Sequence, residues 1–388
     1  MDFNLSEEQQ AFQNAARAFA AGEMAPHAAE WDEKKIFPKN VIAKAGEMGF
    51  CGLYSPEDVG GTGLSRVDSS IILEELAAAC TSTAAYISIH NMATWMTATW
   101  GTDTIKETWC GDLVTGQKLA SYCLTEPGAG SDAGSLLTSA KKDGDNYIIN
   151  GSKMFISGAG ETDLLVVMVR TGAPDSGPKG ISAFAIPADT DGITYGKNED
   201  KMGWNSQPTR AISFENVRVS AEHLLGAEGE GFKIAMKGLD GGRINIASCS
   251  IGAAQACINH TQAYMKERSQ FGKPLAAFQA LQFKLADMVT ELVAARTMVH
   301  LAAFKLDKND ADKTTYCAMA KRFATDIGFN VCNDAIQLHG GYGYIREYPI
   351  ERFQRDSRVH QILEGTNEIM RMVTARRILE DGATDAIR

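Results

Sequence analysis

The segment Ile362-Leu363-Glu364-Gly365-Thr366-Asn367 separates two helical patterns near the end of the chain. Gly365 permits a sharp turn of the backbone, and Thr366 or Asn367 can cap the helix that follows. That helix is predicted to be amphipathic, with these apolar residues on one face: Ile369, Met372, Val373 and Leu379. Glu364 lies at this joint, where the backbone fixes the position of its carboxylate. A general base is usually presented in this way. A solvated turn glutamate is the ordinary alternative.

Three longer helices are predicted upstream of this joint, because apolar residues recur there at alternating steps of three and four. They cover residues 244–265, 281–306 and 323–338. Together with the helix after Gly365 they make the pattern of a four-helix bundle. We assign this bundle to a domain of residues 229–388.

Strand patterns replace helical patterns between residues 121 and 228. Runs rich in β-forming residues at 147–149, 164–169 and 181–186 alternate with loops. Asp143-Gly144-Asp145-Asn146 is typical of a hairpin turn. This region is therefore predicted to be an all-β domain, a small barrel or a sandwich.

The first 120 residues have helical patterns, beginning with a capping box at Ser6 to Gln9. The order helical, β, helical predicts an α+β multidomain fold and disfavours the alternating βαβ arrangement of nucleotide-binding folds. The expected domains are residues 1–120, 121–228 and 229–388.

Composition excludes several classes of protein. A net charge of -10 argues against a nucleic-acid partner, and no apolar run approaches a membrane span, so we expect no membrane insertion. The eight cysteines include no C-x-x-C pair, which predicts buried free thiols and no metal site. The N-terminus lacks a secretory signal pattern. A bacterial cytoplasm is expected, with a mature mitochondrial matrix enzyme as the alternative.

A glycine-rich string from Tyr122 to Asp132 opens the predicted β region. Gly128, Gly130 and Ala133 nearly satisfy the dinucleotide fingerprint G-x-G-x-x-G/A. No long helix is expected after them to hold a pyrophosphate, so the glycines alone indicate a turn.

Two other strings leave a functional and a structural interpretation open. Phe155 and Ser157, which share a face of a strand, form either a wall against a planar cofactor ring or a barrel-lining phenylalanine with a solvated serine. Asp240-Gly241-Gly242-Arg243 is expected just before the first bundle helix. There it serves either as a backbone approach to a phosphate or thioester, or as a flexible hinge with a solvated arginine. His339, alone at a helix end, is expected to be structural.

Taken together, these strings resemble the acyl-CoA dehydrogenase family over essentially the whole chain. The resemblance rests on ordered motifs: Tyr122 to Asp132, Phe155 to Ser157, Arg268 to Phe271, Gln337 to Gly341 and Glu364 to Glu368. It implies an α-helical domain, a central β-barrel and a C-terminal four-helix bundle. It also implies FAD as cofactor, a homotetramer, and an electron-transferring flavoprotein as electron acceptor.

The same resemblance implies roles for individual residues. Glu364 would remove the α-proton of an acyl-CoA thioester while a hydride leaves the β-carbon for flavin N5. The residues implied to bind FAD are Tyr122, Leu124, Thr125, Gly130, Ser131, Phe155, Ile156, Ser157, Arg268, Phe271, Phe278, Gln279, Gln337, Leu338, His339, Gly340, Gly341, Thr366, Asn367 and Glu368. Those implied to contact acyl-CoA are Ser131, Asp240, Gly241, Gly242, Arg243, Gly365 and Arg376. Gln270 stands where many members have Thr, and its role is left open.

The acyl group is expected to be short and branched. Residues 241–250 and 356–365 look most like those of family members that oxidise isobutyryl-CoA in valine degradation, with butyryl-CoA and 2-methylbutyryl-CoA as alternatives. An acyl-CoA oxidase and a non-catalytic CoA-binding protein are alternatives from other classes. The intact Glu364 and flavin strings favour the dehydrogenase. Desolvation in a closed site is expected to raise the pKa of Glu364 despite the adjoining helix N-terminus.

Overall fold

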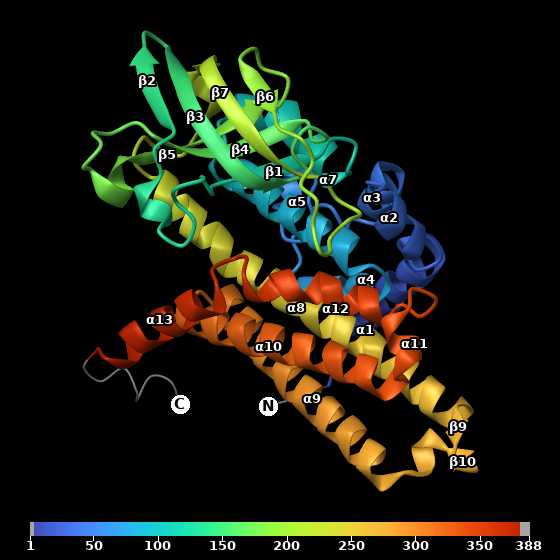
Figure 1. Cartoon of the computed structure of the whole chain (residues 1–388). Coiled ribbons are helices and arrows are strands. Elements are labelled where there is room, and N and C mark those ends of the chain that lie inside the picture. Colours follow the sequence, from blue (N-terminus) through green and yellow to red (C-terminus); the bar gives the residue numbers. More distant parts are fainter. Residues whose placement is uncertain (1–3, 381–388) are drawn as a thin grey trace.

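The computed structural model describes residues 4–380 and shows a helical region, a β region and a second helical region in chain order (Figure 1). This order confirms the predicted fold class. No helix among the described residues is long and apolar enough to cross a membrane. All eight cysteines are buried free thiols, as predicted.

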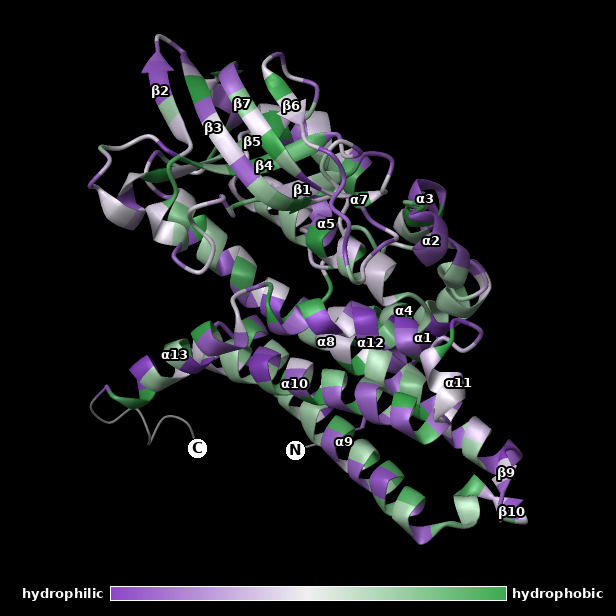
Figure 2. Ribbon diagram, in the orientation of Figure 1, coloured by the Kyte–Doolittle hydropathy of each residue, from purple (hydrophilic) through white to green (hydrophobic). Residues whose placement is uncertain are grey.

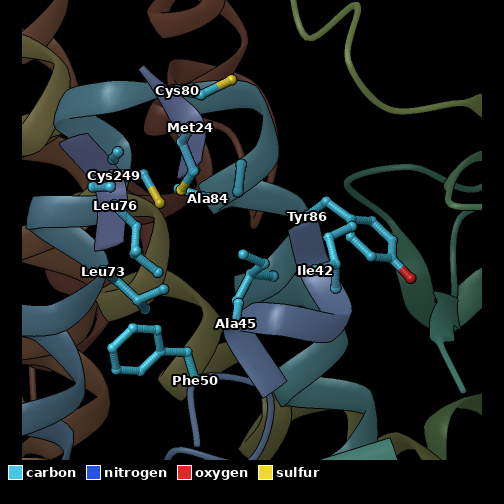
Figure 3. Packing of buried hydrophobic residues seen from close by; sticks show 14 of the residues in the cluster. Met24, Ile42, Ala45, Phe50, Leu73, Leu76, Cys80, Ala84, Tyr86 and Cys249 are labelled. Atoms are coloured by element: carbon cyan, nitrogen blue, oxygen red, sulfur yellow. The ribbon is translucent and has the colours of Figure 1, made fainter. Parts of the chain in front are cut away.

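The N-terminal region is built from five longer helices. They are α1 (Glu7–Phe19), α2 (Ala28–Lys34), α3 (Lys39–Glu47), α4 (Arg66–Ala79) and α5 (Thr81–Trp100), followed by the short α6 (Asp103–Ile105) and α7 (Gly111–Val114). The predicted capping box is present, because Ser6 and Gln9 exchange hydrogen bonds of 3.1 Å. Leu73 and Leu76 of α4 pack with Met24 and with Cys249, which belongs to the C-terminal region (Figure 3). The first and last regions therefore share a core.

The β region is one mixed sheet. Its strands are β1 (Ala120–Cys123), β2 (Ser139–Asp143), β3 (Asn146–Ser157), β4 (Leu164–Arg170), β5 (Ile181–Pro187), β6 (Ile193–Tyr195), β7 (Thr209–Ser220) and β8 (Leu224–Leu225). The path is β6-β7-β3-β2-β4-β5-β8, and β1 pairs in parallel with β4. The predicted hairpin turn joins β2 to β3, where Asp143 pairs with Asn146. One apolar cluster of the sheet includes residues of α5 and of the first bundle helix, which positions β1 beside the bundle.

The C-terminal region is dominated by long helices. They are α8 (Gly231–Glu267), α9 (Gln279–Asp307), α10 (Lys313–His339) and α13 (Asn367–Ile378), with the shorter α11 (Gly341–Tyr344) and α12 (Ile350–Arg358). A small ribbon of β9 (Ser269–Gln270) and β10 (Lys273–Pro274) joins α8 to α9.

Two apolar helix faces remain on the surface. Met372 of α13 and Leu379, which directly follows α13, are 42% and 83% exposed, whereas Met370 is buried, so the apolar face predicted for this helix is not the face that packs against the protein. The outer side of α9 also carries exposed apolar residues between polar ones (Figure 2): Phe283, Val289, Val293, Leu301 and Phe304. Both helices thus present apolar side chains that this chain alone does not cover.

Candidate active site

The carboxylate of Glu364 is presented by an unusual turn. The 3-10 turn η8 (Val359–Gln361) ends just before it, and α13 follows. Glu364 has φ of +56° and Gly365 has φ of +85°, so two consecutive residues are left-handed. Glycine adopts this backbone freely, whereas a glutamate seldom does. The Thr366 hydroxyl accepts the N–H of Ile369 at 3.2 Å, which confirms the helix cap predicted at this joint.

The Glu364 side chain is turned into the protein. Its Oε2 atom is buried and has no hydrogen-bond partner among residues 4–380. Burial raises the pKa of Glu364 to about 7, although the positive charges of Arg243 and Lys321 oppose the shift. The alternative of a solvated turn glutamate is therefore wrong. A carboxyl group with this pKa is suited to take up a proton near neutral pH.

A glycine of α8 makes room for this carboxylate. A Cβ atom on Gly242 would lie 2.4 Å from Glu364 Oε2 and 3.1 Å from the Sδ atom of Met92 on α5. The carboxylate therefore lies directly over the backbone of α8, with Met92 beside it.

The position of Gly242 corrects both sequence interpretations of Asp240 to Arg243. These residues do not precede a helix, because they lie inside α8, which begins at Gly231. No helix N-terminus is present there to approach a phosphate or thioester. Arg243 is buried and donates from Nη1 to Asp240 Oδ1 at 2.6 Å, and Thr314 donates to Asp240 Oδ2 at 2.7 Å. The segment is thus neither a flexible hinge nor a site of solvated charge.

Lys321 of α10 supports the turn that carries Glu364. Its side chain is fully buried, and Nζ donates to the Gly365 carbonyl at 2.8 Å and to Asn367 Oδ1 at 2.9 Å. Burial lowers the pKa of Lys321 to about 7, and the charge of Glu364 opposes this shift. The Asn367 amide also donates to Asp326 Oδ1 at 2.7 Å. Because the Asn367 side chain is bound inside the bundle, a cofactor contact from this residue would have to come from its backbone.

Two further polar groups beside Glu364 lack partners. The hydroxyl of Tyr122 on β1 and the Nε atom of Arg243 are buried without hydrogen bonds within the described part of the chain. Burial raises the pKa of Tyr122 well above its ordinary value, and the charge of Glu364 adds to this. Buried polar atoms are normally paired. Three unpaired groups from β1, α8 and the turn before α13 therefore mark one place where a bound molecule would complete the pairing.

A cavity of about 250 Å³ lies along the glycine-rich loop after β1, lined by residues that include Glu126, Pro127, Gly128, Leu137 and Ser152. A 3-10 turn at Ala133–Ser135 follows this loop in place of a long helix. The conclusion that the glycines do not form a dinucleotide fingerprint is confirmed.

A buried ion pair holds this loop against the sheet. Lys153 of β3 is fully buried and donates to Glu126 Oε1 at 2.8 Å and to the Leu124 carbonyl at 3.1 Å. Glu126 also accepts the N–H groups of Leu137 and Thr138 at 2.6 and 2.9 Å. The loop is therefore shaped from within by one carboxylate.

Phe155 does not line the interior of the sheet. The pairing of β3 with β7 shifts register between Lys153 and Ile156, and Phe155 has φ of +58° and is 61% exposed. A bulge redirects a side chain in this way. This position favours the interpretation of Phe155 as a wall for a planar group outside the sheet.

A second cavity, of about 480 Å³, lies at the distant end of the bundle. The structure brings together here Arg268, the segment Gln337 to Gly341, and Gln270. His339 is stacked on Tyr264, with 4.4 Å between ring centroids. Figure 1 shows that α11, next to this cavity, and α13 lie at opposite ends of the bundle. Along α8, Gly242 and Arg268 are about 26 residues, and so about 39 Å, apart.

Of the remaining predicted site residues, Leu124 and Ile156 are buried, Thr125, Ser157 and Phe278 are half-buried, and others are exposed. Phe271 is 93% exposed at the tip of the β9–β10 ribbon, where it and Gly272 both have positive φ, as a two-residue hairpin requires. Ser131, Glu368 and Arg376 are also exposed. Arg376 lies on α13 about three turns beyond the turn of Glu364, so this chain does not bring it to the carboxylate.

Family models match three consecutive parts of the chain. They are the acyl-CoA dehydrogenase N-terminal domain over residues 6–117, the middle domain over 121–217 and the C-terminal domain over 229–379. The chain belongs to the acyl-CoA dehydrogenase family. The mitochondrial isobutyryl-CoA dehydrogenases of Bos taurus and Dictyostelium discoideum are 56% and 53% identical to it, over 97% of this chain and 90% of each relative. The structure of butyryl-CoA dehydrogenase from Megasphaera elsdenii has a TM-score of 0.94 and 42% identity, over 98% of this chain and 100% of that one.

The site suits the flavin that acyl-CoA dehydrogenases carry. Three features support this: the unpaired Tyr122 hydroxyl on β1, the exposed ring of Phe155 on β3, and the cavity beside Glu126 in the loop after β1. They could receive a planar ring and its polar edge. The second cavity has Arg268, which can bind a diphosphate, and aromatic rings that can flank an adenine.

Several residues of the site have no signal that sequence patterns could have revealed. Met92 and Gly242 matter because of what lies opposite them in space. Lys321 lies just before the helix predicted over residues 323–338, so that pattern gave no signal for it, although in α10 it lies one turn from the buried Cys317 and Ala324.

Proposed function

We propose that this acyl-CoA dehydrogenase uses FAD to oxidise isobutyryl-CoA to methacrylyl-CoA in valine degradation. The observation that carries the proposal is the carboxylate of Glu364, whose Oε2 atom is buried and unpartnered over Gly242 and whose pKa is about 7. The names of the relatives from Bos taurus and Dictyostelium discoideum support the substrate. Butyryl-CoA and 2-methylbutyryl-CoA are the alternative substrates.

Glu364 would accept the α-proton of the thioester. Its backbone N–H donates to no oxygen of residues 4–380, which leaves it free for the thioester oxygen, where negative charge develops. The bound acyl chain would exclude water and keep the Glu364 carboxyl basic enough to react. FAD, when bound, supplies the acceptor for the hydride that leaves the β-carbon.

A homotetramer would complete the flavin site. Arg268, which would hold the diphosphate, lies about 39 Å along α8 from Gly242, which is farther than one FAD molecule reaches, and Gln337 to Gly341 line the same cavity as Arg268. We therefore assign them to the flavin of a neighbouring subunit. The exposed Phe271 and Phe283 support this assignment, because a subunit interface would cover them.

An electron-transferring flavoprotein is proposed as the electron acceptor, in a bacterial cytoplasm or a mitochondrial matrix. An oxidase would instead consume oxygen rapidly without any protein acceptor. A non-catalytic CoA-binding protein would be purified without a visible flavin band.

The decisive experiment is anaerobic mixing of the purified protein with isobutyryl-CoA, butyryl-CoA and 2-methylbutyryl-CoA while the flavin absorbance is followed. Fast bleaching by isobutyryl-CoA that is lost in Glu364→Gln supports both the reaction and the branched preference. Faster bleaching by another substrate contradicts the substrate and leaves the reaction in place. Flavin that no acyl-CoA bleaches contradicts the proposed function.

A further inference from the structure

Arg66, the first residue of α4, is buried beside two aromatic rings. Its guanidinium carbon lies 3.4 Å from the centroid of Tyr54 and 5.0 Å from that of Trp95, and the residue is 8% exposed. A guanidinium plane stacks well on aromatic faces. The three side chains form one compact group, which we call the Arg66 stack.

The Arg66 stack lies one step along α8 from the candidate base. A Cβ atom on Gly241 would lie 2.4 Å from Arg66 Nη1, whereas one on Gly242 would lie 2.4 Å from Glu364 Oε2. Because these two glycines are neighbours on one helix, the guanidinium and the carboxylate lie within roughly 10 Å of each other.

Residues of α5 lie beside Glu364 and Arg66, as the two glycines of α8 do. Met92 lies beside the position that Gly242 and Glu364 share, and Trp95, three residues further along α5, touches Arg66. Residues three apart on a helix share a face. The space beside Glu364 is thus bounded by α5 and α8, and the Arg66 stack lies across it at the next level.

The Arg66 stack is held from behind by polar contacts. Asn245 donates to the Tyr54 hydroxyl at 2.9 Å and to the Ser88 carbonyl at 3.3 Å. The backbone N–H of Arg66 donates to the Asp307 carboxylate at 2.8 Å. No carboxylate among residues 4–380 forms an ion pair with the guanidinium itself. The guanidinium therefore contributes a flat surface and not a paired charge.

We propose that the Arg66 stack closes the far end of the acyl site and limits the length of the acyl chain. This inference rests on the proposed function. An acyl chain whose α-carbon faces Glu364 would extend between α5 and α8 and meet the guanidinium after a few carbon atoms. A chain with more carbons would have to displace Arg66 from both rings.

A guanidinium without an ion pair could instead recognise an acidic acyl group. The stacking argues against this, because the guanidinium lies over the ring of Tyr54 and beside that of Trp95, and these rings cover part of its surface. Succinyl-CoA tests this alternative, since its terminal carboxylate would pair with Arg66.

Arg66→Ala and Arg66→Met test whether the volume or the charge of the Arg66 side chain closes the end of the acyl site. Both retain the backbone N–H that binds Asp307, but only alanine opens the space. We expect Arg66→Ala to raise the ratio of kcat/KM for hexanoyl-CoA to that for isobutyryl-CoA on the order of tenfold or more, as added methylene contacts become available. We expect Arg66→Met, which fills the space without a charge, to keep a ratio near that of the wild type.

Binding gives an independent readout. In a Glu364→Gln background, calorimetric titration with hexanoyl-CoA should show tighter binding when Arg66→Ala is added, and thermal melting with flavin content verifies that each variant is folded. An unchanged chain-length ratio in folded Arg66→Ala overturns the proposal while isobutyryl-CoA oxidation stands. Use of succinyl-CoA by the wild type, lost in both variants, overturns it in favour of charge recognition. Failure of isobutyryl-CoA to bleach the wild-type flavin would contradict the proposed function itself.

Discussion

The backbone of Gly242 lies so close to the carboxylate of Glu364 that a methyl group on its Cα would be 2.4 Å from Oε2. Gly242→Ala should therefore displace the base. A displacement of about 1 Å costs on the order of 100-fold in rate. Stability should not fall in parallel, because alanine is favoured over glycine inside a helix by about 1 kcal/mol.

The measurement is the anaerobic bleaching rate together with the melting temperature. Gly111→Ala is the matched control, because a Cβ atom there meets nothing within 4 Å. A bleaching rate in Gly242→Ala equal to that of the wild type would show that the carboxylate does not need this position.

The pKa of Glu364 predicts a pH-dependent effect on stability. Burial raises this pKa from 4.5 to about 7, so the folded protein binds the proton more tightly than the unfolded chain. Stability should fall as pH rises from about 4.5 to 7 and stay lower above that range. Glu364→Gln should then melt at a higher temperature than the wild type at pH 8, and the two should converge towards pH 4.5. Equal melting temperatures at pH 8 would contradict the raised pKa.

Lys321 should influence both the position and the charge of Glu364. The charged groups that act on Glu364 are Arg243 from α8 and Lys321 from α10. Removal of a positive charge in Lys321→Met should raise the pKa of Glu364 and move the pH-rate profile for bleaching towards alkaline pH. Partial recovery of the rate at pH 9 supports the electrostatic role. A uniform loss at every pH would show that Lys321 acts only through the turn at Gly365.

The Glu126–Lys153 ion pair should be needed as a pair. Glu126→Gln leaves Lys153 buried without its charged partner, which typically costs about 3–5 kcal/mol of the free energy of unfolding. The double variant Glu126→Gln/Lys153→Met should lose less than Glu126→Gln alone. Chemical denaturation measures the stability, and flavin content reports the loop. A double variant less stable than both single variants would contradict this account.

The order of the three regions and the joint at Glu364 could be predicted from the sequence because they depend on local patterns. Apolar spacing predicts the helices, and the capping residues Ser6 and Thr366 act within one turn of themselves. The start of α8 could not be predicted, because Gly241-Gly242 is a typical helix-breaking pair. Tertiary packing outweighs that preference, since Arg66 and Glu364 occupy the space that side chains would need. The residues around the carboxylate are likewise brought together only by the fold.

The 39 Å that separates Gly242 from Arg268 along α8 has a genetic consequence under the proposed assembly. Each active site would take its catalytic base from one polypeptide and its adenosine-binding residues from another. Two defective alleles, one altered at Glu364 and one at Arg268, could then complement each other in a mixed oligomer. Some active sites of the mixed oligomer would contain both an intact base and intact adenosine-binding residues. An oligomer made from either allele alone would contain no such site.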